Sequence, residues 1–197
     1  NCQTHRIFLS QGDYPLKGFH YLLQAMPKIL EQFPDTEIYV AGADILKAET
    51  WKDALKLPAY GKYLKKLIHE NNLEEKINML GRIDAEEMKK QYLSCQVFVC
   101  PSVLENSPNS VGEAMLLGVP CVAANVGGIH NILTDGGDGF LYPPGDVDAL
   151  ADSIIEVFTK EAIVDRLSDN ARKHARVNHD ADQNYYRLMH IYREMLG

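Results

Sequence analysis

The sequence predicts an α/β fold in which a parallel sheet is flanked by helices, and three observations support this fold class. Short runs rich in β-branched and apolar residues recur along the 197-residue chain, and segments with helical apolar spacing separate them. Strands that alternate with helices form parallel sheets, because each connection must cross over the sheet. Hydrophobic residues make up 46% and charged residues 24% of the chain, which supplies a core and excludes intrinsic disorder.

The strand pattern occurs in six short segments. Five are clear and the last is weaker: residues 6–10, 37–41, 76–80, 96–100, 120–124 and 139–142. The clearest helix lies between the first two strands and has these apolar residues on one face: Phe19, Leu22, Leu23, Met26, Leu30 and Phe33. Further helices are expected over residues 60–71 and 84–93, the second with Asp84 as its N-cap.

The C-terminal part of the chain predicts a helical extension. Asp146 is expected to cap one helix, and two further helical stretches follow it. The last stretch, residues 181–196, places an apolar stripe at helical spacing: Tyr185, Leu188, Met189, Tyr192 and Met195. Residues 44–58, which include Trp51, show no clear period and indicate an insertion. Since the chain has no internal repeat and no linker rich in Gly, Ser or Pro, we expect one domain over residues 1–197.

Composition excludes several classes of function. The formal net charge of −7 argues against general nucleic-acid binding. Every apolar run is far shorter than the ~20 residues of a membrane-spanning helix, and the four cysteines form neither a C-x-x-C pair nor a metal-binding pattern. The basic cluster at residues 172–176 is interpreted as a solvated helix face, with peripheral membrane contact as the alternative.

The segments that follow the strands carry the functional information, because ligands of open parallel sheets bind outside the carboxyl ends of the strands. These segments are residues 11–18, 42–43, 81–83, 101–109 and 125–128. Four of the five contain glycine, which lets backbone amides approach a ligand closely. A nucleotide-sized crevice is therefore expected at this edge.

Two glutamates, Glu105 and Glu113, follow the fourth strand and are separated by seven residues. Pro108 disfavours helical geometry at the residue before it, so Glu105 is expected in a loop and Glu113 in the first turn of the next helix. The amides of residues 109–111 would then point into the crevice at the positive end of the helix dipole, where a diphosphate binds well. The alternatives are a capping box, in which Glu113 only bonds the amide of Ser110, and a solvated loop position for Glu105.

Lys17, which precedes Gly18 after the first strand, is the second candidate. Its position on the same side of the sheet suits a cation that neutralises a phosphate leaving group. The alternative is an ordinary surface lysine.

These motifs occur in a particular order along the chain: Lys17-Gly18, Val40-Ala41-Gly42, Leu80-Gly81, Glu105 with Glu113, residues 118–123, Val126-Gly127-Gly128 and residues 138–141. In this order and approximate spacing, the run from residue 6 to residue 158 resembles the C-terminal, donor-binding domain of retaining GT-B glycosyltransferases (group 1, family 4). The resemblance implies a Rossmann-like half of a GT-B fold, with an N-terminal acceptor-binding domain outside these 197 residues.

The resemblance also implies roles for individual residues. The residue at Glu113 holds ribose hydroxyls, the one at Glu105 holds donor-sugar hydroxyls, Lys17 binds the diphosphate, and the backbone at Arg82-Ile83 meets the base. We carry over Lys17 and Glu105 as catalytic, and the expected donor-binding residues are Gly12, Lys17, Gly42, Arg82, Ile83, Glu105, Asn106, Ser107, Pro108, Asn109, Ser110, Val111 and Glu113. No metal or other cofactor is expected, because the helix N-terminus and basic side chains stabilise the diphosphate.

The expected activity is hexosyl transfer from a nucleotide sugar, most simply a UDP-sugar, with retention of configuration in polysaccharide or glycoconjugate synthesis. The acceptor would be a carbohydrate or a lipid-linked molecule bound by the other domain, and the location cytoplasmic, at the inner face of the membrane for a lipid acceptor. This chain alone is expected to be inactive, and residues 181–196 are expected to pack toward the other domain.

Two positions depart from the family pattern. Gln11-Gly12 stands where the family commonly has Gly-Arg, and His130-Asn131 stands where Pro-Glu is customary. The missing arginine leaves a non-catalytic nucleotide-binding module as one alternative. A nucleotide-sugar epimerase or a phosphorylase of the same architecture is the other.

Overall fold

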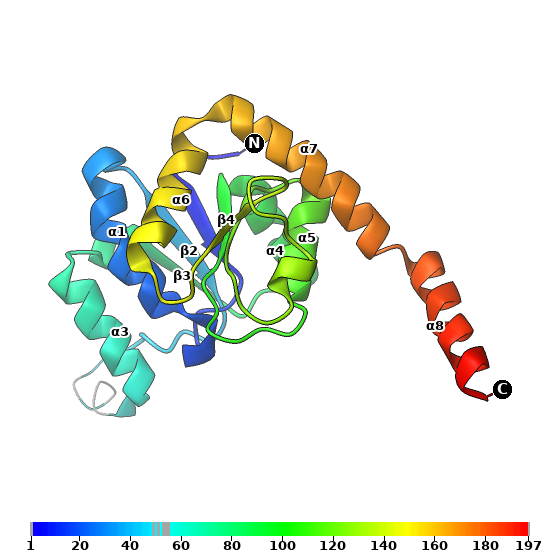
Figure 1. Ribbon diagram of the computed structural model, residues 1–197. Coiled ribbons are helices and arrows are strands. Elements are labelled where there is room, and N and C mark those ends of the chain that lie inside the picture. The colour runs from blue at the N-terminus through cyan, green and yellow to red at the C-terminus, as the bar shows by residue number, and fades with distance from the viewer. Residues whose placement is uncertain (1, 49, 51, 53–55, 197) are drawn as a thin grey trace.

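The computed structural model describes residues 2–48, 50, 52 and 56–196, and within this part the chain forms one parallel sheet with helices on both faces (Figure 1). The strands are β1 (Arg6–Leu9), β2 (Glu37–Ala41), β3 (Ile77–Gly81), β4 (Val97–Cys100), β5 (Cys121–Ala124) and β6 (Phe140–Tyr142). Their order in the sheet is β3-β2-β1-β4-β5-β6, and every neighbouring pair is parallel. The predicted α/β, Rossmann-like fold is confirmed.

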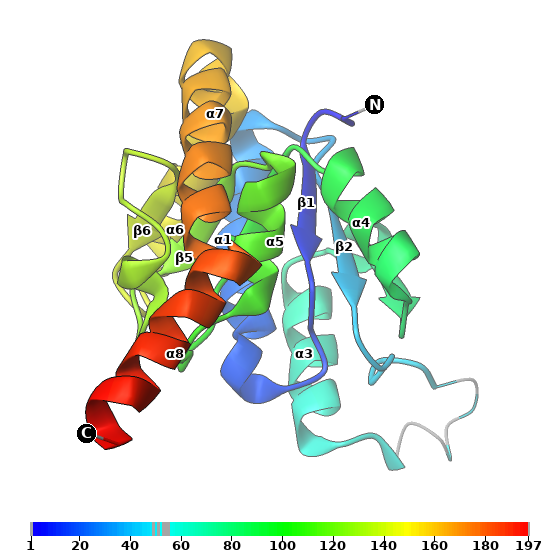
Figure 2. The same ribbon diagram turned by 90° about the vertical axis from the view of Figure 1, so that its right-hand side faces the viewer.

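Two groups of helices cover the sheet. The helices are α1 (Phe19–Gln32), α3 (Ala59–Glu70), α4 (Ala85–Ser94), α5 (Asn109–Leu117), α6 (Val147–Thr159), α7 (Glu161–Asn178) and α8 (Ala181–Leu196), with short 3₁₀ helices η1 (Pro15–Lys17), η2 (Glu74–Lys76) and η3 (Ile129–Asn131). Helices α1, α3 and α6 share a core with one face of the sheet, and α4, α5 and α7 share a core with the other (Figures 1 and 2).

The two cores follow directly from the alternation of side chains along each strand. In β1, Ile7 and Leu9 point to the first core, whereas Phe8 points to the second. Both faces of the central strands are buried, and this is why β4, β5 and the part of β1 after Arg6 are continuous apolar runs without alternating polar residues.

The helix caps predicted from the sequence are present. The Asp84 carboxylate accepts the Glu87 amide at 2.9 Å at the start of α4, and the Asp146 carboxylate accepts the Ala149 amide at 2.9 Å at the start of α6. Each cap satisfies an amide that the first helical turn leaves without a partner. These caps fix where α4 and α6 leave the sheet.

The strand order reverses between β1 and β4. The chain proceeds from β1 outward to β2 and β3, returns to the middle at β4, and continues outward on the other side. The connections after β1 and β4 therefore leave in opposite directions and open a crevice at the carboxyl ends of these two strands. The fold thus creates a site at one particular point of the sheet edge.

The C-terminal extension consists of two helices with different surroundings. Helix α7 packs closely on α5: a β carbon on Gly112 would overlap the imidazole of His179, and one on Gly118 would overlap the guanidinium of Arg172. The basic cluster is therefore not simply a solvated face, because Arg172 also donates to the Leu117 carbonyl oxygen and His174 bonds Asp138 at 2.6 Å.

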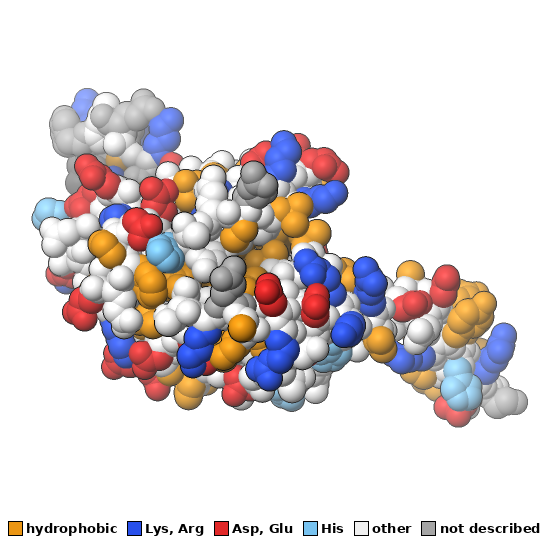
Figure 3. Space-filling model, turned by 90° about the horizontal axis from the view of Figure 1, so that it is seen from above, with side chains coloured by type: hydrophobic (Ala, Val, Ile, Leu, Met, Phe, Trp, Pro, Cys, Tyr) orange, Lys and Arg blue, Asp and Glu red, His pale blue; other side chains and the backbone are white. Residues whose placement is uncertain are grey.

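Helix α8, in contrast, projects away from the sheet and has no buried side chain (Figures 1 and 2). Hydrophobic side chains lie on the projecting arm (Figure 3), among them Tyr185, Tyr192 and Met195, which are 58%, 51% and 77% exposed. None of the described helices combines the length and the apolar composition that crossing a bilayer requires. Trp51, within the predicted insertion, lies outside the described residues.

Candidate functional site

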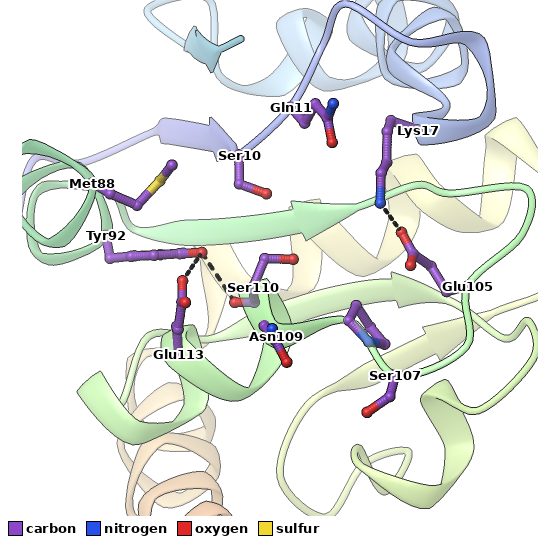
Figure 4. Close-up of a pocket in the computed structure, with 11 residues that line it drawn as sticks. Ser10, Gln11, Lys17, Met88, Tyr92, Glu105, Ser107, Asn109, Ser110 and Glu113 are labelled. Carbon is purple, nitrogen blue, oxygen red and sulfur yellow. Dashed lines mark hydrogen bonds and ion pairs between the residues drawn. The ribbon is translucent and has the colours of Figure 1, made fainter. Parts of the chain in front are cut away.

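A cavity of about 360 Å³ lies at the point where the strand order reverses (Figure 4). It is lined by residues that follow β1, by residues that follow β4, and by the facing sides of α4 and α5: Ser10, Gln11, Lys17, Met88, Tyr92, Glu105, Ser107, Pro108, Asn109, Ser110 and Glu113. Seven of the predicted site residues are therefore brought together: Lys17, Glu105, Ser107, Pro108, Asn109, Ser110 and Glu113.

Lys17 reaches the cavity because the loop after β1 is fixed against the loop after β4. Gly18 has a φ of +73°, and a β carbon there would overlap the carbonyl oxygen of Pro101. The Val103 amide also donates to the Leu16 carbonyl oxygen at 2.8 Å. Lys17 Nζ consequently lies 2.5 Å from Glu105 Oε1. It is thus not a free surface lysine but one half of an ion pair between the two loops.

Glu105 lies in a loop, as the position of Pro108 predicted, and its side chain is only 10% exposed. The hydroxyl of Ser102, itself buried, donates to Glu105 Oε1 at 2.8 Å. The backbone is held from the other side, since β carbons on Gly127 and Gly128 would overlap the carbonyl oxygens of Glu105 and Asn106. The carboxylate is therefore held from its side chain and from its backbone.

Glu113 is positioned differently from the prediction. Helix α5 begins directly after Pro108, so Glu113 lies in the second turn and Ser110 lies inside the helix instead of capping it. The capping-box alternative is therefore wrong. The Glu113 carboxylate instead accepts the hydroxyl of Tyr92 at 3.2 Å. Burial, together with the negative charge of Glu113, raises the pKa of Tyr92 far above its usual value, so this hydroxyl remains protonated at neutral pH.

The N-terminus of α5 offers two backbone amides to the cavity, one fewer than the three expected from residues 109–111. The amides of Asn109 and Ser110 have no acceptor among the described residues, whereas the Val111 amide donates to the Pro108 carbonyl oxygen at 3.1 Å. The Val111 side chain is fully buried in the second core. Two amides and the helix dipole, without Val111, therefore remain available to an anion.

The other predicted residues lie at the same edge of the sheet but outside the cavity lining: Gly12, Gly42, Arg82, Ile83 and Asn106. Arg82 is exposed, and Ile83 packs against the second core. A β carbon on Gly12 would overlap the side chain of Val40 and would also lie close to the ring of Phe19. Since Gly12 occupies the place of the family arginine, packing against β2 and α1 explains why no larger side chain fits there.

Five lining or supporting residues were not among the predicted site residues: Ser10, Gln11, Met88, Tyr92 and Ser102. Ser10 and Gln11 directly follow β1, at the sheet edge where the crevice was expected. Tyr92 and Met88 lie one turn apart on α4, where a tyrosine in an apolar position is typical of a core residue. Ser102 lies three residues before Glu105, too ordinary a spacing to be informative. Their roles depend on which segments meet in space, and local sequence does not encode this.

The cavity combines groups that suit a phosphorylated sugar derivative. Lys17 and the two free amides of α5 attract an anion, and the oxygens of Glu105 and Glu113 accept hydrogen bonds from neutral hydroxyl groups. Among the described residues no group of three or more His, Cys, Asp or Glu side chains is arranged to hold a metal ion. The hydroxyl groups and the phosphate of such a ligand would lie next to each other, because Glu105 and Lys17, which would bind them, are in contact.

Comparison with known proteins identifies the family. Residues 3–174 match the model of the glycosyl transferases group 1 family, which covers most of the chain. The chain therefore belongs to the group 1 glycosyltransferases, and its structural neighbours are glycosyltransferases of the GT-B fold.

The similarity extends to particular relatives. The phosphatidyl-myo-inositol mannosyltransferase of Mycobacterium leprae is 30% identical over 161 residues, which is 81% of this chain and 38% of that protein. Sucrose-phosphate synthase from Thermosynechococcus elongatus superimposes with a TM-score of 0.79 at 26% identity, over 97% of this chain and 45% of that one. HepE of Anabaena in complex with UDP-glucose superimposes with a TM-score of 0.75 at 24% identity, over 88% and 44%. The chain thus spans less than half the length of these proteins.

Proposed function

From membership of this family, we propose that the chain is the half of a GT-B hexosyltransferase that binds a nucleoside-diphosphate sugar, and that the sugar is transferred with retention of configuration. The observation that carries the proposal is the contact of Lys17 with Glu105 beside the N-terminus of α5. We choose UDP as the nucleotide because a protein of the same fold, HepE, is described with UDP-glucose.

In this proposal Lys17 and the amides of Asn109 and Ser110 bind the diphosphate. Transfer loosens the bond between the sugar and the diphosphate, and negative charge grows on the leaving phosphate. A fixed cation and a helix N-terminus stabilise this charge more strongly in the transition state than in the bound donor. Neither group needs a metal ion for this role.

The two glutamates bind the two sugars of the donor. Glu113, which is exposed to the cavity, accepts hydrogen bonds from the ribose diol, and Glu105 accepts them from the transferred sugar. The bond that breaks joins the phosphate to that sugar, so the residue for the phosphate and the residue for the sugar must be neighbours. The 2.5 Å separation of Lys17 Nζ and Glu105 Oε1 meets this requirement.

The remaining predicted residues surround the ligand through their backbones. Arg82 and Ile83 follow β3 at the same sheet edge and would contact the base, while Gly12 and Gly42 bring two loop backbones close together. Asn106 and Ser107, both exposed after Glu105, complete the side nearest the transferred sugar.

The acceptor would bind to a second domain. Relatives more than twice as long leave room for such a domain, and the exposed apolar stripe of α8 would pack against it. The chain alone would then bind donor without transferring sugar. We propose a carbohydrate or lipid-linked acceptor for glycoconjugate synthesis, at the cytoplasmic membrane face for a lipid, because one relative is named for a phosphatidylinositol substrate.

The test is metal-free calorimetry of the chain with UDP, GDP and ADP. Wild type is expected to bind one nucleotide, and Lys17→Ala and Glu113→Gln are each expected to weaken it by about tenfold or more, as loss of a charged hydrogen bond predicts. Lys28→Ala is the matched control, because Lys28 also forms an ion pair, at 2.8 Å with Asp152, but between α1 and α6.

The outcomes separate the alternatives. Equal effects of Lys17→Ala and Lys28→Ala, or no binding to any nucleotide, would contradict the assignment of the donor site. If a nucleotide binds but the longer protein converts a UDP-sugar into its epimer without an acceptor, the epimerase alternative replaces transfer.

A further inference from the structure

Tyr92 is a buried residue whose hydroxyl group emerges at the cavity. Its side chain belongs to α4 and is 1% exposed. The ring is in edge contact with Phe8, with 5.1 Å between ring centroids, and with Phe98, at 5.2 Å. Two strands of the sheet therefore fix the ring, and the place of its hydroxyl follows from the core.

The hydroxyl lies between two acceptors on α5. It is 3.1 Å from the Ser110 carbonyl oxygen and 3.2 Å from Glu113 Oε2 (Figure 4). A phenol carries only one proton, so it donates to one of these oxygens at a time. The same atom thus touches the first turn of α5 and the carboxylate of its second turn.

Glu113 depends on this contact because it has little else to orient it. Its side chain is exposed, and the hydrogen bond with Tyr92 is the one that the structure records for its carboxylate within the described residues. A long, exposed carboxylate otherwise samples several rotamers, and a ligand must then restrict them at an entropic cost.

We propose that Tyr92 is a positioning residue that orients the Glu113 carboxylate toward a vicinal diol, the ribose of the nucleotide. The inference rests on the proposed function, since it deepens the role of Glu113 in donor binding. In this role Tyr92 acts through the Glu113 carboxylate. Phe8 and Phe98 fix the Tyr92 ring, and the hydroxyl of that ring in turn restricts the exposed Glu113 carboxylate. The orientation of the group that binds the diol therefore depends on packing in the core.

The test compares two ligands, UDP and 2′,3′-dideoxy-UDP, on wild type and Tyr92→Phe. Phenylalanine keeps the ring contacts and removes only the hydroxyl. We expect Tyr92→Phe to lower the affinity for UDP by about fivefold, as the loss of one hydrogen bond predicts. Its affinity for the dideoxy ligand should stay within about twofold of the wild-type value. The matched control is Tyr142→Phe, because the Tyr142 hydroxyl is also buried but has no hydrogen-bond partner among the described residues.

Equal weakening of both ligands would mean that Tyr92 is merely structural and would overturn the inference. A wild type that binds UDP and the dideoxy ligand equally would instead contradict the proposed role of Glu113 in binding ribose. The two failures are therefore distinguishable.

A second variant keeps the test valid if Tyr92→Phe does not fold. Glu113→Asp keeps the charge and the Tyr92 side chain but withdraws the carboxylate by one methylene group. It is expected to lose affinity for UDP by about the same factor and none for the dideoxy ligand. Unchanged affinity of Glu113→Asp for UDP would show that orientation by Tyr92 is unnecessary.

Discussion

Around the cavity, neighbouring loops approach so closely that Gly18, Gly127 and Gly128 have no room for a β carbon, whereas α8 contributes no buried side chain at all. The cavity loops owe their geometry to contacts within the described chain. Helix α8 is held by its own backbone hydrogen bonds, and a free helix of its 16 residues is marginal in water. The two regions therefore differ in what holds them: the cavity loops are fixed by contacts with one another, whereas α8 gains no burial from the described residues.

Among single substitutions, the largest expected effect comes from adding a methyl group where Gly127 packs against the backbone of Glu105. In Gly127→Ala the new methyl group would overlap the Glu105 carbonyl oxygen, at a residue whose φ is +51°. Strain and overpacking together predict a loss of about 2–4 kcal/mol in the free energy of unfolding. Chemical denaturation of the purified variant measures this loss.

Gly136→Ala is the matched control for that substitution. Gly136 has a similar φ of +66°, but a β carbon there meets nothing within 4 Å. This variant is expected to lose about 1 kcal/mol in the free energy of unfolding, which is the cost of left-handed geometry for a residue with a β carbon. If the two variants are equally destabilised, close packing beneath Glu105 is not what distinguishes the cavity loops.

A smaller effect is expected from the hydroxyl group that supports Glu105. Ser102→Ala removes a buried donor at 2.8 Å from a carboxylate that is only 10% exposed, and Lys17 remains as its partner. The expected loss in the free energy of unfolding is about 1 kcal/mol. Ser153→Ala serves as the control, because Ser153 donates at 2.8 Å to a carbonyl within its own helix. A Ser102→Ala loss no greater than the control's would contradict the claim that Ser102 holds Glu105.

The fold and part of the site were predictable because they depend on local pattern. Continuous apolar runs such as β4 indicate buried parallel strands, and Pro108 alone places Glu105 in a loop. The sequence also placed Lys17 and Glu105 at the same sheet edge. Their direct contact was not predictable, because it depends on Gly18 approaching Pro101 across two loops.

The errors have physical causes as well. The pattern of Ser110 with Glu113 matches a capping box, but a proline at the N-cap starts α5 two residues earlier. Val111 has apolar neighbours one turn later, Ala114 and Met115, and this spacing assigns it to the core. The partner of Glu113, Tyr92, lies 21 residues away on another helix, where no local rule connects them.

The smallest expected effect comes from removing α8, the region without buried side chains. A chain that ends at Asp180 keeps His179, which packs on Gly112, and removes α8. Since α8 buries no side chain in the described structure, the melting temperature is expected to change by about 2 °C or less, which corresponds to a loss of no more than about 1 kcal/mol in a domain of this size. Affinity for UDP should be unchanged, because no residue of α8 lines the cavity.

A chain that ends at Lys160 provides the contrast. It removes α7, whose Leu167, Ala171 and Ala175 are buried, and uncovers α5 directly behind the cavity. This chain is expected to unfold or to lose UDP binding, because α5 carries both Glu113 and the two free amides. If removal of α8 alone lowers the melting temperature as much as this longer truncation, then α8 packs on the described domain, and the contrast between the two regions fails. If only the longer truncation matters, the apolar stripe of α8 has no stabilising role within this chain.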